Sequence, residues 1–408
     1  MSRGTEVAYP HWATWLDSME GVPEWPQPVE SPAEQASRGA LLRWGHETFG
    51  RLGEVLPGLG LALGLALAGQ WGARWLGSSV LGFARSPISE ISVAVLLGLV
   101  LRNTIGLPAV YERGLRLCLR AILRVGIVLL GFRLSLAAVG QIGLLGLPII
   151  GGCIAAALVA VTVINRLLGL PRRLGSLIAV GTSICGVSAI VATAPTIDAE
   201  EDEVSYAVAC VTLFGMLALF TYPFLAHGLF GADARRAGLF LGTAIHDTAQ
   251  VAGAGLMYQQ QFHAPRALNA ATVTKLVRNL CMAGVIPLVG ALYRRSASGA
   301  VGRARPRWYQ MVPLFVVGFV AAAALRTLGD LGDRPFRLLD DSLWSRFLVE
   351  ADGLAAWCLA TAMAAVGLGT SLTGLRQLGW KPFCVGFAAA AVVGGVSFGL
   401  IQALGPYL

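Results

Sequence analysis

The stretch Gly181-Thr-Ser-Ile-Cys-Gly-Val-Ser-Ala189 decides how this chain folds, together with a second stretch, Gly242-Thr-Ala-Ile-His-Asp-Thr-Ala-Gln-Val-Ala-Gly253. Both begin Gly-Thr-x-Ile, and both place glycines and hydroxyl groups in apolar surroundings. Helix packing through small residues would explain the glycines, but it requires neither the hydroxyls nor an imidazole beside a carboxylate. Backbone freed by a helix break at membrane depth is tolerated only inside protein or around a cavity. The two stretches therefore predict two interrupted helices that lie close together.

The composition around these stretches is that of a membrane protein. Of the 408 residues 55% are hydrophobic and 13% are charged, whereas a soluble domain has about a quarter charged residues. The predicted fold class is an all-α polytopic bundle with about 10–11 transmembrane helices. Residues 51–408 form the predicted transporter domain. Residues 1–50, which are rich in proline near their middle, are expected to be a disordered cytoplasmic tail.

Eleven apolar stretches are candidates for membrane spans. The second is short, and the fifth and seventh contain the two polar stretches. The predicted spans are 53–71, 88–101, 117–137, 144–164, 174–195, 204–225, 238–257, 270–292, 312–328, 353–372 and 383–404.

Basic residues in alternate connections predict a cytoplasmic N-terminus, because cytoplasmic loops are rich in Lys and Arg. This interpretation places Arg173 and Arg236 inside, and the acidic run Asp198-Ala-Glu-Glu-Asp-Glu203 on the opposite side. The net charge of +8 is carried by basic residues scattered between the spans. No nucleic-acid partner is therefore expected.

The sequence contains a weak internal repeat, in which an early segment resembles a segment near the C-terminus. Gly131-Phe-Arg-Leu-Ser-Leu136 matches Gly367-Leu-Gly-Thr-Ser-Leu372 at an offset of 236, and Leu101-Arg-Asn-Thr-Ile-Gly106 resembles Leu325-Arg-Thr-Leu-Gly329 after a shift in the alignment. Spans two to four thus echo spans nine to eleven. Copies an odd number of spans apart face opposite ways, as in the inverted-topology repeats of transporters. The polar stretches lie only two spans apart, however, where a tandem of five-helix halves would separate them by five.

His246 and Asp247 lie within the seventh span, where an acidic side chain costs roughly 2.5–3.5 kcal/mol on insertion scales. Such residues usually face a pathway or a partner. Imidazole titrates near neutrality when unperturbed, so both residues are candidates to carry a coupled proton, with a sodium ion as the alternative. On a continuous helix His246 would share a face with Gln250 and Gly253. The structural alternative for each is a satisfied internal hydrogen bond.

Lys275 and Arg278 are three residues apart and would share one face of the eighth span. If that helix begins near Pro265, the pair lies about 15–20 Å along it, near mid-membrane. If it begins nearer Lys275, both side chains snorkel to the interface. In transporters, half-helix N-termini face anionic substrates near the midplane. The expected substrate-binding residues are Thr182, Ser183, Cys185, Gly186, Ser188, His246, Gln250, Lys275 and Arg278.

These motifs, in this order, resemble a known family. They are Gly181-Thr-Ser-Ile-Cys-Gly-x-Ser-Ala189, Thr193-Ala-Pro195, Glu203-Val-Ser-Tyr-Ala207, Ile245-His-Asp-x-Ala-Gln-Val-Ala252 and Ala271-Thr-Val-x-Lys-x-x-Arg278. The resemblance is to the YeiH-like bacterial inner-membrane proteins, described as sulfate exporters, and it covers residues 53–408. That family is similar to the bile-acid, arsenite and riboflavin transporter superfamily, which implies two inverted halves with two broken helices. It usually has Glu where this chain has Asp247, so the charge is kept on a shorter side chain.

The expected function is secondary transport, an exporter of a small anion such as sulfate or an organosulfonate across the bacterial inner membrane. The expected partners are that anion, the lipid bilayer and the coupling proton or sodium ion, with a homodimer left open. Neither a cofactor nor a metal is expected, because the seven cysteines contain no CxxC pair and no Walker A sequence is present.

Two other functions stay open. An anion channel would require a ring of filter residues, which one chain with two unequal halves does not obviously supply. An enzyme would require Cys185 or Ser188 to pair with His246 as nucleophile and base. The sequence lacks the second glycine of a Gly-x-Ser-x-Gly elbow around Ser188, and the protein is therefore not expected to be an enzyme.

Overall fold

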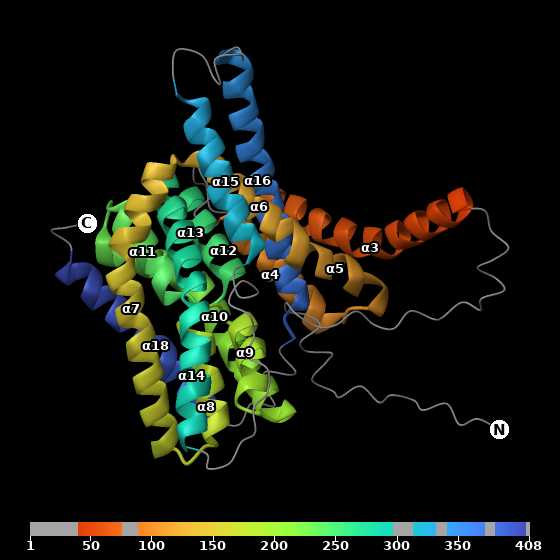
Figure 1. The fold of residues 1–408 in the computed structure, drawn as a ribbon. Coiled ribbons are helices and arrows are strands. Elements are labelled where there is room, and N and C mark those ends of the chain that lie inside the picture. The colour runs from red at the N-terminus through yellow and green to blue at the C-terminus, as the bar shows by residue number, and fades with distance from the viewer. Residues whose placement is uncertain (1–39, 76–88, 297–312, 332–340, 372–379, 405–408) are drawn as a thin grey trace, which may run out of the picture.

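The structure is a computed structural model, which describes residues 40–75, 89–296, 313–331, 341–371 and 380–404. Within these ranges every regular element is a helix (Figure 1). The α-helices are α3 (Ala40–Trp75), α4 (Glu90–Thr104), α5 (Glu112–Leu117), α6 (Leu123–Leu130), α7 (Leu136–Leu167), α8 (Arg172–Ser183), α9 (Val187–Thr193), α10 (Glu201–Phe230), α11 (Ala234–Ala244), α12 (Thr248–Phe262), α13 (Pro265–Leu280), α14 (Met282–Ser296), α15 (Leu314–Gly329), α16 (Asp341–Gly369) and α18 (Trp380–Ala403). A π-helical segment, η3 (Cys118–Ile122), joins α5 to α6, and short 3-10 turns occur at η2 (Ala109–Tyr111), η4 (Gly131–Arg133) and η5 (Ala194–Thr196).

The all-α membrane class is confirmed. Each of the eleven predicted spans coincides with one helix or with consecutive helices. Residues 1–39 of the predicted tail lie outside the described residues, and α3 already begins at Ala40. Among the described residues, six helices are long and apolar enough to cross a bilayer: Gly53–Trp75, Leu136–Leu167, Asp202–Phe230, Pro265–Tyr293, Ser342–Gly369 and Trp380–Ala403.

Helices α11 and α12 form a hairpin that enters the bundle and turns back. A Cβ atom added to Gly242 in α11 would lie 2.7 Å from the Ala271 carbonyl, and one added to Gly238 would contact the Ala267 carbonyl, so α11 runs parallel to α13. In α12 the order is reversed. Its first residue, Thr248, bonds to Asn279 near the end of α13, whereas Gly255 packs against Leu268 near the start. The seventh span is therefore a re-entrant hairpin rather than a crossing.

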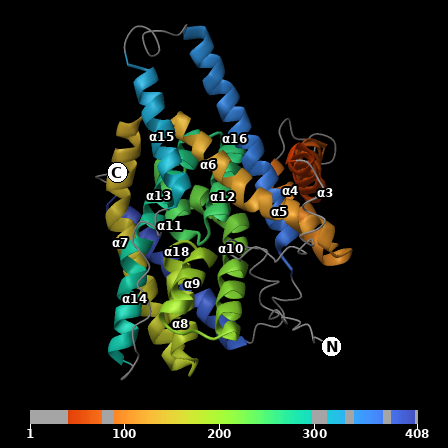
Figure 2. The same ribbon diagram turned by 45° about the vertical axis from the view of Figure 1, so that its right-hand side comes forward.

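Helices α8 and α9 repeat this arrangement from the other end of the bundle. Arg173 bonds to Glu200 at 3.3 Å, and Gly181 packs against Val211, so α8 runs parallel to α10. Ile190 of α9 folds back against Gly181 of α8, and α9 returns toward the end where α8 began. Figures 1 and 2 both place α8 and α9 beside α14 in one half of the bundle and α11 and α12 in the other half.

The two hairpins change which connections share a side of the membrane. The prediction that Arg173 and the acidic run lie on opposite sides is wrong, because Arg173 pairs with Glu200. The acidic run instead caps α10, where Glu200 and Glu203 form a capping box. Arg236 is separated from Arg173 by α10, a single spanning helix. The expectation that these two arginines share a side is therefore also wrong.

The predicted inverted repeat is visible in the packing of its two glycines. Gly131 packs directly on the Phe319 carbonyl of α15, and Gly367 of α16 packs directly on the Val95 carbonyl of α4. The first copy contains α4 to α7, and the second contains α15, α16 and α18. The glycine of each copy therefore packs on the first helix of the other copy. Such reciprocal contact is what a two-fold relationship produces.

The same relationship extends to the hairpins and explains their position in the chain. Helix α7 packs on α8 and α13, while its counterpart α18 packs on α11 and α10. Helices α8–α10 therefore correspond to α11–α13. In the first copy the hairpin follows its three companion helices, whereas in the second copy it precedes them. This circular permutation leaves the two hairpins only two spans apart.

A substitution of the repeat glycines tests the reciprocal packing. We expect Gly367→Ala and Gly131→Ala each to lower the free energy of unfolding by about 1–3 kcal/mol, because the new methyl group would meet a backbone carbonyl that cannot move. Thermal unfolding of the purified protein in detergent measures this. The matched control is Gly353→Ala in α16, where a methyl group would meet nothing within 4 Å. Equal melting temperatures for Gly353→Ala and Gly367→Ala would refute the assignment.

Candidate functional site

The tips of the two hairpins meet inside the bundle. In the first tip, residues 184–186 leave the helix, and Gly186 has φ = 71°, a conformation that favours glycine. In the second tip, residues 245–247 are extended or irregular, with φ = −95° and ψ = 149° at Asp247. A Cβ atom on Gly186 would lie 3.0 Å from Asp247 Oδ2, so the tips are in contact. The predicted pair of interrupted, adjacent helices is confirmed.

Each tip leaves the last carbonyl groups of a half-helix without an intrahelical partner. Lys275 of α13 supplies partners to both tips. Its Nζ donates hydrogen bonds to the carbonyl oxygens of Ile184 at 2.7 Å, of Ile245 at 3.4 Å, and of His246. One ammonium group thereby joins the ends of α8 and α11.

Arg278, one helical turn further along α13, does the same with its guanidinium group. In α8, Nε donates to the Ser183 carbonyl at 2.6 Å and Nη2 donates to the Thr182 carbonyl. In α11, Nη1 donates to the carbonyls of Thr243 at 2.7 Å and Ile245 at 3.0 Å. Because the C-terminal end of a helix carries a partial negative charge, these cations also match the local electrostatics.

The two cations are deeply buried. Lys275 is 1% exposed and Arg278 is 0% exposed. Helix α13 begins at Pro265, which places the pair about 15–20 Å along the helix. The alternative in which both side chains snorkel to the interface is therefore wrong.

Asp247 occupies the start of α12. Its carboxylate accepts a hydrogen bond from the Ala249 backbone at 2.8 Å, and Gln250 completes a capping box by accepting from the Asp247 backbone. The Asp247 side chain thus already bonds N–H groups at the start of α12.

His246 lies in the break itself. Its side chain is 1% exposed and hydrogen-bonds the backbone of Thr182 in the other tip. Its Nδ1 atom is buried and has no hydrogen-bond partner within the described residues. The helical face predicted to contain His246 and Gln250 does not exist, because the helix begins only at Thr248.

The remaining predicted site residues lie at the same tips. Thr182 and Ser183 are buried, and the Ser183 hydroxyl donates to the Val180 carbonyl of its own helix at 3.2 Å. Cys185 is buried, and its thiol contacts Met282 Sδ at 3.7 Å. Ser188 is partly exposed, as is Asp247. The structure therefore places these residues in or next to the two breaks, whereas the Gln250 amide lies against Gly215 of α10.

Two further residues belong to the site and were not predicted. Asn279 is 1% exposed, donates to the Thr248 hydroxyl at 3.1 Å, and keeps a buried Oδ1 that has no partner within the described residues. Its position four residues after Lys275 could have revealed it by helical periodicity. Gly215 of α10 lies directly against the Gln250 amide, and no sequence signal marked that contact.

These features define a class of protein: a polytopic helical membrane protein with two opposed re-entrant hairpins, the architecture of transporters. A family model described as "Conserved hypothetical protein 698" matches residues 57–386, and the chain belongs to this family of UPF0324 membrane proteins.

Relatives from three bacteria show how far the similarity extends. The UPF0324 membrane protein Atu0671 of Agrobacterium fabrum is 32% identical over 364 residues, covering 88% of this chain and 94% of its own length. The UPF0324 inner membrane protein YeiH of Escherichia coli is 32% identical over 355 residues, covering 84% and 93%. A UPF0324 membrane protein of Nitratidesulfovibrio vulgaris is 29% identical over 348 residues, covering 83% and 90%. No solved structure matches this chain.

Removal of the Arg278 guanidinium tests whether it holds the tips together. We expect Arg278→Gln to destabilise the protein by about 3–5 kcal/mol, because several buried carbonyls lose their partner. The yield of monodisperse protein and its melting temperature measure this. Arg326→Gln is the control, since Arg326 forms a partly exposed i,i+4 pair with Asp330. Unchanged stability in Arg278→Gln would show that the carbonyls do not depend on it.

Proposed function

We infer that this protein is a secondary active transporter that moves a small anion across the bacterial inner membrane, by alternating access around the hairpin tips. The observation that carries this inference is a charge count. Lys275 and Arg278 are buried together at the tips, and Asp247 is the only acidic side chain in the two polar stretches and α13. With Asp247 ionised, one positive charge is in excess.

The partial charges of the helix ends do not cancel that excess. Each break contains one helix C-terminus and one helix N-terminus, and their partial charges of about −0.5 and +0.5 are opposite in sign. A buried net charge is strongly unfavourable in a membrane. A bound anion would neutralise it. An anion channel remains the second candidate, because the same charge count would favour anions in a pore.

The route to this site is consistent with the exposure of its polar residues. Ser188, Asp247 and Thr248 are partly exposed although they lie at the centre of the bundle. The two hairpins enter from opposite ends, so each can separate the tips from one aqueous side. The sulfate or organosulfonate substrate is proposed on the family resemblance alone, since the names of the relatives state no substrate.

Charge balance also supports proton coupling. Protonation of Asp247 raises the excess from one positive charge to two, which matches a divalent anion such as sulfate. Asp247 is the preferred proton carrier because it is partly exposed. His246 remains a candidate through its unpartnered Nδ1, but its bond to Thr182 favours a positioning role.

A test of the coupling uses anion binding and transport together. Sulfate affinity should rise as the pH falls, because protonation removes a negative charge beside the anion. In Asp247→Asn the affinity should stay high at every pH, at least about tenfold above the unprotonated wild type. Isothermal titration calorimetry in detergent measures this, with Asp233→Asn, at the surface start of α11, as the control.

Liposomes then separate proton coupling from structural damage. Asp247→Asn should exchange labelled sulfate between compartments yet lose accumulation driven by a pH gradient, while Asp247→Glu should keep both. For His246→Gln, loss of both activities with a lower melting temperature would indicate positioning. Sulfate accumulation by Asp247→Asn under a pH gradient would remove Asp247 as the proton carrier.

The hairpins also determine the proposed orientation. Cytoplasmic connections are rich in arginine. The connection that follows α4 lies on the same side as Arg173 and holds Arg102, Arg113, Arg116 and Arg120. We therefore assign this side, with the N-terminus and the acidic run, to the cytoplasm, and Arg236 to the periplasm. A membrane-impermeant thiol reagent added to intact cells should label Ala232→Cys and spare Ala199→Cys, with the parent chain as background. Labelling of both would contradict the opposed sides, and labelling of Ala199→Cys alone would reverse the orientation.

A further inference from the structure

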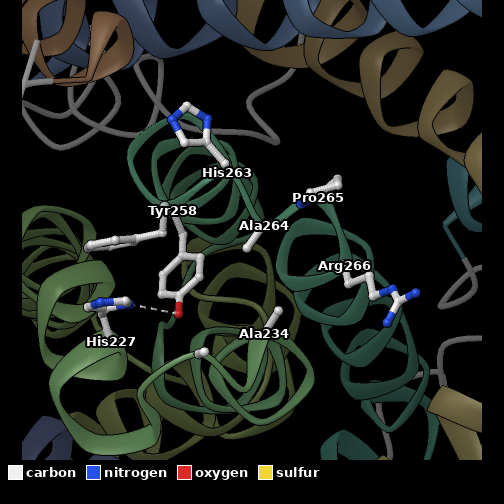
Figure 3. Close-up of a pocket in the computed structure, with 9 residues that line it drawn as sticks. His227, Ala234, Tyr258, His263, Ala264, Pro265 and Arg266 are labelled. Atoms are coloured by element: carbon white, nitrogen blue, oxygen red, sulfur yellow. Dashed lines mark hydrogen bonds between the residues drawn. The ribbon is translucent and has the colours of Figure 1, made fainter. Parts of the chain in front are cut away.

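A pocket lies at the mouth of the α11–α12 hairpin, at the ends of α11 and α12 that are opposite the tip residues. Its volume is about 360 Å³, and it is bounded by the end of α10, the start of α11, the end of α12 and the start of α13 (Figure 3). It is lined by His227, Ala232, Ala234, Tyr258, Phe262, His263, Ala264, Pro265 and Arg266. Small-molecule sites have volumes of roughly 300–1,000 Å³, so the pocket can hold a small organic molecule.

One wall of the pocket is aromatic and fixed in place. The His227 ring stacks on the Phe262 ring with centroids 3.8 Å apart and an angle of 5° between the planes. Tyr258 packs against Phe262 with ring centroids 4.7 Å apart and is itself 1% exposed. Together with the small side chains of Ala234 and Ala264, this wall offers apolar surface to a ligand.

The Tyr258 hydroxyl is held only weakly by the protein. It lies 3.4 Å from His227 Nδ1 and 3.5 Å from the Gly231 carbonyl, whereas hydrogen bonds of a hydroxyl group are about 2.7–2.8 Å long. Figure 3 shows the hydroxyl in the middle of the lining residues, between His227 and Ala234. A buried polar group with two long contacts can accept a closer partner from a ligand.

The opposite side of the pocket is formed by the start of α13, whose positive end lies across the pocket from the negative ends of α10 and α12. Helix α13 begins at Pro265 with no side-chain cap, and the positive end of its dipole therefore faces the pocket. Arg266 lies at the rim, where Figure 3 shows its guanidinium directed outward. None of the nine lining residues is acidic. The neighbouring Asp233 caps α11 and pairs with Arg236 at 3.1 Å.

We propose that this pocket binds a small organic anion, with the apolar body against Tyr258 and Phe262 and the acid group at the start of α13 beside Arg266. The site does not rest on the proposed transport function. The same chemistry, an acid group joined to an apolar body, is offered by a soluble organic acid and by the phosphate region of an anionic lipid.

Calorimetric titration of the full-length protein in detergent tests the site, with benzenesulfonate as the probe. Two matched probes each lack one feature: benzenesulfonamide has no charge, and sulfate has no apolar body. We expect benzenesulfonate to bind at least about tenfold more tightly than either, because it alone combines a charge-assisted hydrogen bond with apolar contact.

Variants then locate the binding. Ala264→Leu, which fills the pocket, should abolish benzenesulfonate binding, and Arg266→Gln and Tyr258→Phe should each weaken it by about three- to tenfold. Arg326→Gln should leave it unchanged, and the melting temperature of each variant checks folding. Benzenesulfonate binding that survives Ala264→Leu would overturn the proposal. Absence of benzenesulfonate binding would overturn it as well, whatever the transport assays give.

Nanodiscs identify the source of the ligand. If an anionic lipid occupies the pocket, phosphatidylglycerol nanodiscs should suppress benzenesulfonate binding relative to phosphatidylcholine nanodiscs. If the ligand is soluble, the two affinities should be equal.

Discussion

The hydrogen bonds from Lys275 and Arg278 to the ends of α8 and α11 are the interaction on which the rest of this structure depends. Two half-helices end inside the bundle, where no bulk water reaches their last carbonyl groups. The ammonium and guanidinium groups leave α13 three residues apart, on one face, and reach both ends at once. Helix α13 must therefore pass directly beside both tips. Gly238 and Gly242 of α11 allow this close approach, because they have no side chain where α11 packs on α13.

Lys275 and Arg278 contribute something at the tips that apolar side chains cannot contribute, namely hydrogen-bond donors. An apolar side chain at position 275 or 278 could fill the same volume, but it would leave the carbonyls without donors. Buried cations provide those donors and bring charge with them, which Asp247 balances only in part. The same residues that allow the hairpins to end inside the bundle thus create the excess positive charge on which the proposed anion binding rests. Structure and proposed function share one cause here.

Much of this arrangement could be predicted from the sequence. The glycines and hydroxyls at Gly181–Ala189 and Gly242–Gly253 predicted both breaks, and the helical spacing of Lys275 and Arg278 predicted their shared face. The direction of the chain after each break could not be predicted. Two half-length apolar helices contain about as many residues as one full crossing, so hydropathy cannot distinguish a hairpin from a span. That ambiguity produced the wrong sides for Arg236 and for the acidic run.

The hydrogen bonds of individual side chains at the tips could not be predicted from the sequence either. A sequence shows which residues are polar, but it does not show that a side chain will bond its own backbone. Asp247 satisfies the start of α12, and Ser183 bonds its own helix. From the sequence, Ser183 was expected to bind substrate and Asp247 to carry a proton. The contact between Gly215 and Gln250 joins residues from different helices, and no local pattern encodes such a meeting.

The bonds at the tips also limit how this fold can move. Because Lys275 and Arg278 join both hairpins to α13, the tips and α13 must move as one body. Helices α7, α10 and α18 pack on that body, whereas α3–α6, α15 and α16 pack mainly on one another (Figures 1 and 2). The boundary between these groups includes the contact of Gly253 with the flexible side chain of Met363. The proposed alternating access would therefore proceed by sliding between the two groups of helices, since separating the hairpins would leave buried carbonyls and buried cations without partners.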